Sequence, residues 1–351
     1  MNARVERLRA ELERLGAASF LVTNPVNVEY LTGFASSNAF VLLNRTQVFL
    51  LTDGRYIEAA RTVQGVDVVQ LDRELARALA PRLGDLAEGP VGVEAEHVTL
   101  AIDEHLRGSG AELVPTKGVV LGLRAVKEPG ELETIRRAAR ILSDVYERVS
   151  KEAVVGRTER ELAWWFEQAV HDEGAHDVAF STIVATGPNA ALPHHHPGDR
   201  RIEAGDIVLV DAGARLDGYC SDCTRTFATG PLPEELRRAY STCRSAQEAA
   251  LAAVAPGADA KDLDAIAARQ ISEGGFEVKH GLGHGVGLEV HELPVLRPGA
   301  DGSLAAGNVV TIEPGTYLAG VGGVRLEDLV IVTDDGPEVL TSFTKELLTL
   351  E

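Results

Sequence analysis

The second half of the chain contains an internal repeat, and this repeat restricts the possible folds more than any other feature of the sequence. Residues 156–162 read GRTEREL, and 257–263, which begin 101 residues later, read GADAKDL. Each copy offers a Thr or Asp suited to cap a helix, followed three residues later by an acid. Residues 205–211 (GDIVLVD) match 307–313 (GNVVTIE) at an offset of 102 residues. We therefore expect two helix–helix–hairpin halves related by a pseudo-twofold axis.

Each repeated strand ends in a carboxylate, and a second carboxylate follows on the returning chain. Asp211 is followed by Asp222 across an Asp-Gly turn, and Glu313 is followed by Glu327 across a glycine-rich loop. Carboxylates beside apolar runs are rarely buried unless they are paired or bind metal. The nearby arginines are too few to neutralise all four. Two divalent cations would balance them, with His284 as the nitrogen ligand, so these five residues are the predicted metal ligands.

The turn between Asp211 and Asp222 has a geometric consequence. If Asp217-Gly218 is a two-residue hairpin turn, Asp211 and Gly213 share a sheet face with Asp222 and Thr224. The two acids are then diagonal neighbours, roughly 7–8 Å apart at the backbone. Their side chains could reach a common ion from there.

Four carboxylates and one imidazole suit hard or borderline divalent ions such as Mn²⁺, Co²⁺ or Zn²⁺. A pair of ions about 3.5–4 Å apart activates a bridging water at neutral pH and binds a tetrahedral intermediate. For any single acid, a buried ion pair or a hydrogen-bonded strand carboxylate is the competing interpretation. Five such residues placed by an internal repeat favour the metal site.

The remaining histidines cluster in two places. His194, His195 and His196 follow a Leu-Pro pair, while His280 and His291 flank the predicted ligand histidine within a glycine-rich block. The glycines let backbone approach a ligand closely. No lysine and Ser/Thr follow them, so the block does not resemble a phosphate cradle. We expect His280 and His291 to be functional, and His195 and His196 to lie in a solvated loop.

The first part of the chain alternates short apolar runs with helical patterns, which indicates an α/β layer. A hairpin turn is expected at residues 44–46, and a long amphipathic helix should follow Lys127-Glu128-Pro129 and continue to about Val149. We place the domains at residues 1–122 and 127–351. The expected strands are Ser19–Thr23, Ala39–Leu43, Gln47–Leu51, Asp67–Leu71, Val91–Glu94 and Glu112–Val114, and the expected helices are Arg4–Leu15, Tyr56–Val63, Arg73–Leu86 and Leu100–Arg107.

Bulk properties narrow the class of protein. A chain of 351 residues is long for one core, so two domains are the natural expectation. The net charge of −19 repels phosphate backbones and anionic lipid, so nucleic acid and membranes are not expected partners. No apolar run approaches the roughly 20 residues that span a bilayer, and the first 16 residues lack the apolar region of a secretory signal. The three cysteines are interpreted as small core residues. The expected location is cytoplasmic.

The site motifs together resemble metallopeptidase family M24, the pita-bread peptidases that include methionine aminopeptidases, prolidases and aminopeptidases P. The resemblance covers residues 127–351, and residues 24–34 (NPVNVEYLTGF) are similar to the creatinase-type N-terminal domain of the proline-specific M24B branch. It implies an α/β creatinase-type domain followed by an α+β pita-bread catalytic domain. The motifs that carry it are Asp211-Ala-Gly, Asp222-x-Thr224-Arg225-Thr226, Gly-x-Gly-His284-Gly-x-Gly, Ile312-Glu313-Pro314-Gly315 and Arg325-x-Glu327-Asp328.

The resemblance implies roles for the ligands. Asp211 would hold one metal ion, His284 and Glu313 the other, and Asp222 and Glu327 would bridge the two. The ions implied are a pair of Mn²⁺, with Co²⁺ or Zn²⁺ as alternatives.

The resemblance also implies roles for residues around the metals. His194, His280 and His291 match histidines that line the site in the proline-specific branch. His291 and His194 would orient the scissile carbonyl and stabilise its oxyanion. Glu313 would move the proton from the bridging hydroxide to the leaving nitrogen. Arg325 would neutralise charge beside the bridging glutamate.

Two activities of this branch compete. Prolidases cleave dipeptides and need a cation or loop that captures the free carboxylate, whereas this chain has Val295 where an arginine would serve. The segment with Asp53, Arg55 and Tyr56 resembles one found in small aminopeptidases P, in which it reaches the partner's active site in a homodimer. An ordinary strand end is the alternative for that segment. The expected function is therefore an Xaa-Pro aminopeptidase acting on proline-containing peptides, with Xaa-Pro dipeptidase as the alternative.

Two other classes share this architecture. Creatinase-type amidinohydrolases have both domains but no metal, and the five intact ligands argue against that class. Non-catalytic pita-bread modules that bind other macromolecules tend to lose ligands and gain basic surfaces. This chain shows neither change.

Overall fold

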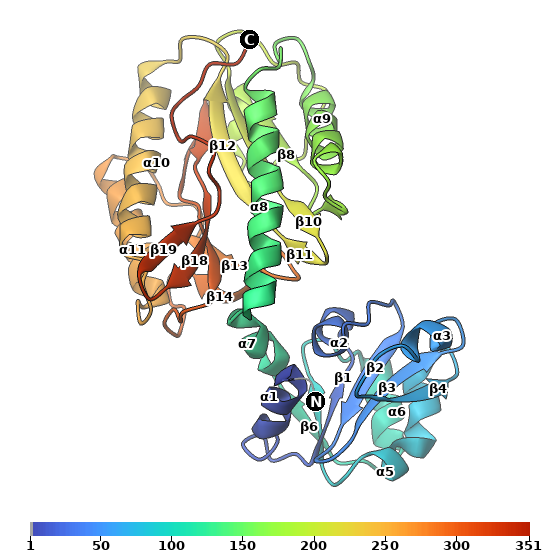
Figure 1. The fold of residues 1–351 in the computed structure, drawn as a ribbon. Coiled ribbons are helices and arrows are strands. Elements are labelled where there is room, and N and C mark those ends of the chain that lie inside the picture. The colour runs from blue at the N-terminus through green and yellow to red at the C-terminus, as the bar shows by residue number, and fades with distance from the viewer. Residues whose placement is uncertain (1–2) are drawn as a thin grey trace. The chain divides into compact units, whose positions relative to one another are not determined.

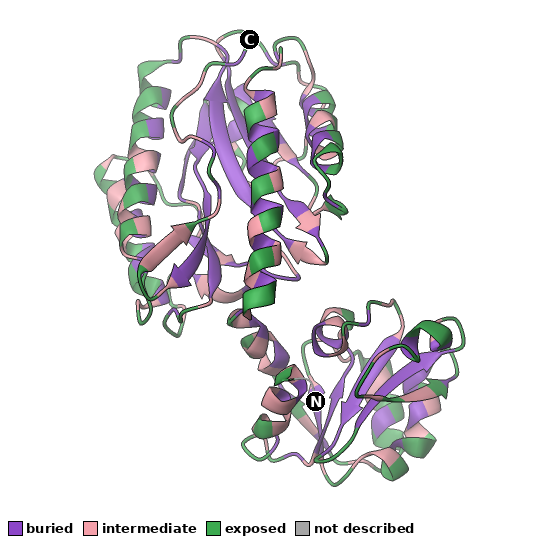
Figure 2. Ribbon diagram, in the orientation of Figure 1, coloured by how far each residue is buried: buried purple, intermediate pink, exposed green. Residues whose placement is uncertain are grey.

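The computed structural model describes residues 3–351 and divides into two units, residues 1–124 and 125–351 (Figure 1). In both units the central strands are buried, whereas edge strands such as those at residues 67–71 and 336–339 are partly exposed, and the helices expose their outward faces (Figure 2). Each unit therefore has its own core.

The N-terminal unit is built on one six-stranded sheet in the order β4-β3-β2-β1-β5-β6. β1, β2 and β3 pair antiparallel, whereas β4, β5 and β6 join the sheet in parallel. All six strands predicted from the sequence are present, and the expected turn joins β2 to β3. The strands are β1 (Ser19–Val22), β2 (Ala39–Leu43), β3 (Val48–Asp53), β4 (Asp67–Leu71), β5 (Val91–Glu94) and β6 (Leu113–Thr116).

The helices of this unit differ from the prediction: α7 (Val119–Ala125) was not expected, and the helices predicted for residues 4–15 and 56–63 end earlier, at Glu11 and Ala60. A helix that was not expected, α2, begins after Asn24, whose side chain accepts from the Val26 amide, and ends at Gly33 with φ 71°. The single helix predicted for residues 73–86 is wrong: the chain forms three short pieces there because Pro81 cannot donate to a helical ladder. The helices are α1 (Ala3–Glu11), α2 (Pro25–Thr32), α3 (Ile57–Ala60), α4 (Leu75–Leu79), η1 (Ala80–Arg82), α5 (Leu83–Leu86), α6 (Leu100–Gly108) and α7 (Val119–Ala125).

The C-terminal unit confirms the repeat. Each half contributes two helices followed by strands that include a long hairpin. The first half contains α8 (Pro129–Val149), α9 (Glu159–Asp172), β7 (Asp177–Val178), β8 (Ile183–Thr186), η2 (Gly187–Ala191), β9 (Ile207–Ala212), β10 (Ala214–Leu216), β11 (Tyr219–Cys220) and β12 (Cys223–Ala228). The second contains α10 (Glu234–Ala252), α11 (Ala260–Glu273), β13 (Gly283–Gly285), β14 (Glu292–Leu296), β15 (Val309–Ile312), β16 (Gly315–Leu318), β17 (Gly322–Arg325), β18 (Asp328–Thr333) and β19 (Gly336–Val339).

Equivalent backbone bonds relate the two halves. The Gly156 amide donates to the Ile202 carbonyl at 2.8 Å, and the Gly257 amide donates to the Leu304 carbonyl at 2.7 Å. Gly156 and Gly257 are 101 residues apart, and Ile202 and Leu304 are 102 residues apart, which are the two offsets of the sequence repeat. The duplication therefore extends from the sequence to the hydrogen bonds that place α9 and α11.

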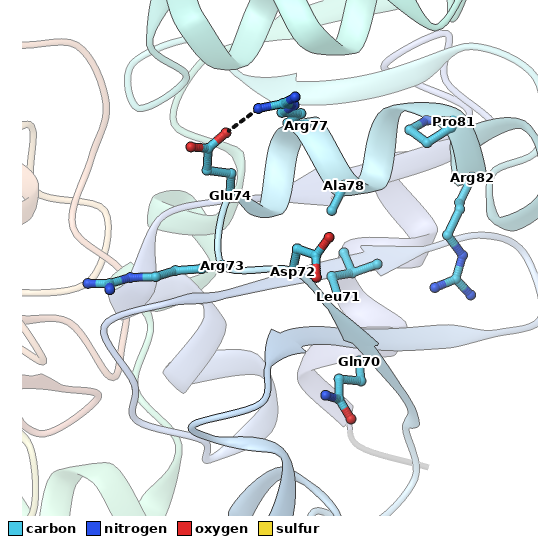
Figure 3. Close-up of a pocket in the computed structure, with 9 residues that line it drawn as sticks. All are labelled: Gln70, Leu71, Asp72, Arg73, Glu74, Arg77, Ala78, Pro81 and Arg82. Atoms are coloured by element: carbon cyan, nitrogen blue, oxygen red, sulfur yellow. Dashed lines mark hydrogen bonds and ion pairs between the residues drawn. The ribbon is translucent and has the colours of Figure 1, made fainter.

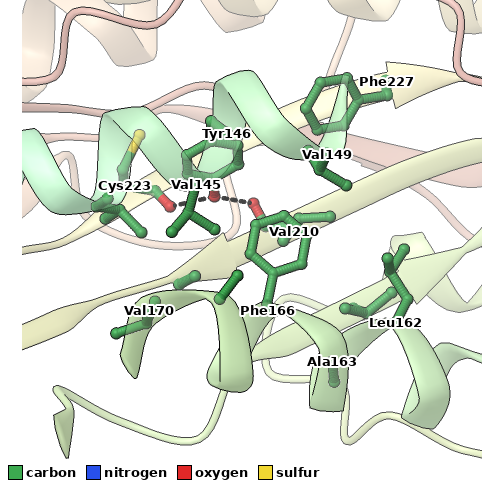
Figure 4. Packing of buried hydrophobic residues seen from close by; sticks show 14 of the residues in the cluster. Val145, Tyr146, Val149, Leu162, Ala163, Phe166, Val170, Val210, Cys223 and Phe227 are labelled. Carbon is green, nitrogen blue, oxygen red and sulfur yellow. Dashed lines mark hydrogen bonds between the residues drawn. The ribbon is translucent and has the colours of Figure 1, made fainter. Parts of the chain in front are cut away.

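The core of the first half fixes α8 across the strands that carry the candidate site. Tyr146 is fully buried, and its hydroxyl lies 2.7 Å from the Cys223 carbonyl and 3.1 Å from the Val210 carbonyl (Figure 4). Its ring packs edge-on against Phe166, with centroids 5.4 Å apart. Burying an aromatic ring contributes roughly 1.5–3 kcal/mol. This packing locks β9 and β12 together beneath the helix.

Two expectations from composition can be compared with the structure. All three cysteines are buried and unpaired, which confirms their interpretation as core residues. Over residues 3–351, no helix is both long and apolar enough to cross a membrane.

Candidate metal centre

The hairpin that carries Asp211 and Asp222 has the register predicted from its turn. Leu216 pairs with Tyr219 and Asp211 pairs with Thr224, so the same register runs through both ends of the hairpin. The turn residues Asp217-Gly218 have φ values of 49° and 86°, as a tight two-residue turn requires. Asp222 is therefore diagonal to Asp211.

Three acids converge at one point. Asp211, Asp222 and Glu327 each offer a carboxylate oxygen, and these oxygens lie within 4.8 Å of one another. All three residues are buried. Asp211 Oδ1, Asp222 Oδ1 and Glu327 Oε1 are buried without a hydrogen-bond partner. Buried oxygens of this kind are costly unless a cation satisfies them, so the donor set fits a divalent ion.

The electrostatics of the three acids support the same conclusion. Burial raises the pKa values of three carboxyl groups above their ordinary values, those of Asp211, Asp222 and Glu327. The pKa of Asp222 is raised further by the charges of Glu327 and Asp211. Mutual repulsion of this kind is relieved when a cation sits between the carboxylates.

The other oxygens of the cluster are held by protein donors. Arg325 Nη2 donates to Asp211 Oδ2 at 2.5 Å, and the Thr224 hydroxyl donates to Glu327 Oε2 at 2.7 Å. Arg325 Nε in turn lies 3.0 Å from the Thr224 hydroxyl. These bonds orient Asp211 and Glu327 so that the second oxygen of each points into the cluster.

His284 and Glu313 complete the predicted ligand set. His284 Nε2 lies 3.2 Å from Glu313 Oε1 and 3.8 Å from Asp222 Oδ2. Its Nδ1 lies 3.0 Å from the Gly285 carbonyl, which suits a tautomer with Nε2 free to bind metal. Burial raises the pKa of Glu313, but its bond to His284 and the charges of His284, Arg325 and His280 together outweigh burial and lower that pKa to about 2. The structure thus brings together all five predicted ligands.

The three other predicted histidines gather around this cluster. The His291 ring is 4.3 Å from that of His284, centroid to centroid. Burial lowers the pKa of His280 and of His291, and the nearby His194 lowers both further. His194 follows Pro193, whose carbonyl accepts from Arg325 Nη1 at 3.2 Å, and its own side chain is exposed.

The expectation that His195 lies in a solvated loop is wrong, whereas His196 is exposed as expected. The His195 side chain is only 14% exposed, and its Nε2 lies 2.8 Å from Glu159. Glu159 is far away in sequence, so no local pattern indicated this contact.

Tyr317 belongs to the site and was not predicted. Its hydroxyl lies 2.9 Å from His280 Nε2 and 3.0 Å from Arg325 Nη1. The segment between Glu313 and Glu327 was expected to be a glycine-rich loop, but it forms the β16–β17 hairpin. A side chain at Gly315 would overlap the Tyr317 ring, so glycine there makes room for the tyrosine rather than for a loop.

The predicted substrate-binding residues of the N-terminal unit form a local network at the end of β3. Asp53 accepts from the Arg55 amide at 2.8 Å and from Arg55 Nη2 at 2.8 Å. Bonds from Arg55 and Asn38 lower the pKa of Asp53. The Tyr56 hydroxyl lies 2.7 Å from that of Ser37. Asp53 therefore orients Arg55, whose side chain is 47% exposed.

A cavity of about 1000 Å³ lies in the N-terminal unit, yet its lining does not suit catalysis (Figure 3). Its charged side chains are of both signs, and Arg77 pairs with Glu74 at 3.4 Å. The acid cluster described above is not part of it. Its lining consists of Gln70, Leu71, Asp72, Arg73, Glu74, Arg77, Ala78, Pro81 and Arg82.

Comparison with known proteins gives matches over both units. The profile of "Metallopeptidase family M24" matches residues 133–334, and that of "Creatinase/Prolidase N-terminal domain" matches residues 4–126. An Xaa-Pro dipeptidase of Pyrococcus furiosus is 34% identical over 99% of this chain and 100% of its own length.

Solved structures are similar over nearly the whole chain. An Xaa-Pro dipeptidase from Bacillus anthracis superposes with a TM-score of 0.95 at 34% identity, covering 99% of both chains. An X-Pro aminopeptidase from Thermotoga maritima superposes with a TM-score of 0.87 at 33% identity, covering 97% of this chain and 100% of that one.

Proposed function

The chain belongs to metallopeptidase family M24, and from that premise we propose that it is an Xaa-Pro aminopeptidase, which releases the N-terminal residue from peptides with proline in second position. It has the pita-bread fold of prolidases behind a creatinase-type N-terminal domain. The observation that carries the proposal is the convergence of three buried, unpartnered carboxylate oxygens beside His284 and Glu313.

Two divalent ions, which we propose to be Mn²⁺, would supply Lewis acidity and ionise a water at neutral pH. Asp211 would hold one ion, His284 and Glu313 the other, and Asp222 and Glu327 both. The need for bound metal ions distinguishes the proposed peptidase from a metal-free amidinohydrolase and from a binding module without catalysis.

Adding Mn²⁺ is expected to raise the melting temperature of the metal-free protein. A ligand at 100 times its dissociation constant stabilises by about 2.7 kcal/mol. Asp222→Asn should lose most of this gain, yet be at least as stable as the parent without metal, because one of the mutually repelling acids is gone. Differential scanning calorimetry measures both effects, with Asp144→Asn on the exposed face of α8 as the control. An equal Mn²⁺ response in both variants would contradict the ligand assignment.

The proposed roles of the surrounding residues follow from their positions. Glu313 is ionised at neutral pH, so it can accept a proton and deliver it to the leaving nitrogen. His291, whose ring lies 4.3 Å from that of His284, and His194 would donate to the oxyanion of the scissile carbonyl. Arg325 holds Asp211 and neutralises part of the acid cluster.

The proposed preference for longer peptides is based on Val295. This residue pairs with His284 across β13 and β14, and we propose that its apolar side chain takes the place of a cation that would capture the carboxylate of a dipeptide. Xaa-Pro dipeptidase is the second candidate. It is favoured by the names of the relatives from P. furiosus and B. anthracis.

Cleavage of Ala-Pro-Pro is expected to exceed that of Ala-Pro by about 10–100-fold in kcat/KM, because a hydrogen bond to a charged group such as the dipeptide carboxylate is worth roughly 1.5–3 kcal/mol. The assay uses the Mn²⁺-loaded protein, with Ala-Ala-Ala as the control for proline specificity. Val295→Arg should raise activity on Ala-Pro selectively. Robust cleavage of Ala-Pro with none of Ala-Pro-Pro would assign the protein as a dipeptidase.

The proposal extends to a cytoplasmic homodimer in which residues 53–56 of one protomer contribute to the active site of its partner. The support for this is the orientation of Arg55 by Asp53, which holds a half-exposed guanidinium in one direction. Such a guanidinium could meet a peptide backbone or carboxylate.

A further inference from the structure

Glu159 is the first residue of α9 and is fully buried, with no exposed surface. Acidic residues suit the first turn of a helix, but they usually remain in water there. The side chain of Glu159 instead points into the segment of residues 186–198, which runs from the end of β8 past the histidine triplet. A buried carboxylate is stable only if donors surround it.

The donors to Glu159 come from both ends of this segment. Its Oε1 accepts from the Thr186 amide at 2.9 Å, the Thr186 hydroxyl at 2.9 Å and Asn189 Nδ2 at 3.0 Å. Its Oε2 lies 2.8 Å from His195 Nε2 and accepts from the Gly198 amide at 3.1 Å. Burial raises the pKa of Glu159, but the bonds from Asn189, His195 and Gly198 outweigh it, and the net pKa is lowered.

The same segment also contacts Arg325, the arginine that binds the predicted metal ligand Asp211. Arg325 Nη1 donates to the Pro193 carbonyl at 3.2 Å, while Arg325 Nη2 binds Asp211. His194 therefore lies between two restrained neighbours, Pro193 and His195. Its backbone is fixed from both directions although its own side chain is exposed.

We propose that Glu159 is a positioning residue: through His195 and the Gly198 amide it fixes the 186–198 segment so that His194 meets the scissile carbonyl. This inference rests on the proposed function, because it assigns His194 to the substrate. A displacement of about 1 Å in such a group can lower the rate of reaction about 100-fold.

Glu159→Gln is the first test, because glutamine keeps the shape of the side chain but its NH2 group cannot accept the hydrogen bonds that the carboxylate accepts. We expect a roughly 10–100-fold loss in kcat and a much smaller change in KM. Hydrogen exchange should become faster only in residues 186–198. His195→Gln should show a smaller loss of the same kind. His196→Gln, on the exposed neighbour, should leave kcat and exchange unchanged.

A double-mutant cycle separates positioning from general stability. In a His194→Ala background, Glu159→Gln should lower kcat less than about 3-fold, since the group it positions is gone. Loss of the same factor in both backgrounds would overturn the inference and leave Glu159 a structural residue. Unchanged exchange in residues 186–198 would overturn it as well.

The two proposals can fail separately. Absence of Xaa-Pro cleavage by the parent protein would refute the proposed function, while hydrogen exchange would still show whether Glu159 orders the segment. If Glu159→Gln does not fold, His195→Gln carries the same cycle with His194→Ala.

Discussion

Glu313→Gln is expected to lower kcat at least about 1000-fold, within the range for loss of a general acid–base group. Glu313 is a carboxylate with a pKa of about 2, held 3.2 Å from His284 Nε2 and 3.9 Å from Arg325 Nε. Glutamine has the same shape but cannot take up a proton, and it is a weaker ligand for hard cations. Steady-state kinetics with Ala-Pro-Pro at saturating Mn²⁺ measure the effect.

Metal content distinguishes the two ways in which this variant could lose activity. Retention of both ions with lost turnover assigns proton transfer to Glu313, and loss of one ion assigns ligation. Glu277→Gln serves as the control, because Glu277 is exposed and pairs only with Lys279 in the described structure. Turnover by Glu313→Gln at a tenth of the parent rate or more would remove Glu313 from the mechanism.

Asp328→Asn is expected to destabilise the fold by about 3–5 kcal/mol, the usual cost of breaking a buried ion pair. Asp328 lies directly after Glu327 and is fully buried, 2.9 Å from Arg225 Nη2 and 2.5 Å from Lys345 Nζ. Burial raises its pKa, but the two cations outweigh burial and lower it, so the group is charged. The asparagine would leave the Arg225 guanidinium buried without its counter-charge.

Urea unfolding of the metal-free protein measures this loss without interference from metal binding. Glu338→Gln is the matched control, because its pair with Arg136 is 2.7 Å long but about one third exposed on both sides. Exposed pairs contribute 0–1 kcal/mol, so that variant should shift the midpoint little. Equal shifts in the two variants would show that burial of the Arg225–Asp328 pair does not matter to stability.

The metal centre could be predicted from sequence because its evidence is local. Asp211 and Glu313 each follow an apolar strand, where a charge needs a partner, and the repeat shows that both strands end alike. The register that brings Asp222 beside Asp211 follows from one two-residue turn. The strand ends and the turn are local patterns, and the repeat is visible by comparing two stretches of the sequence, so none of these inferences needs a contact between distant segments.

What could not be predicted depends on contacts between distant segments. Glu159 looks like an ordinary acid at a helix start, and only the fold brings Thr186 and His195 to it. Tyr317 lies in a glycine-rich segment whose composition predicts a loop, whereas the structure forms a hairpin there. Gly322 and Gly323 lie where other chain segments approach closely: a side chain at Gly323 would overlap the Ala190 carbonyl. Composition alone cannot separate flexibility from crowding.

The duplication within one chain has a consequence for the orientation in which a peptide can bind. A peptide has an amino end and a carboxyl end, and a site built from two identical subunits would accept it equally in both orientations. Because both copies lie in one chain, they were free to diverge while their acids stayed matched. His280, His284 and His291 come from the second copy and His194 from the first, so the two ends of the site differ. The proposed release of a residue from only one end of a peptide requires such a difference.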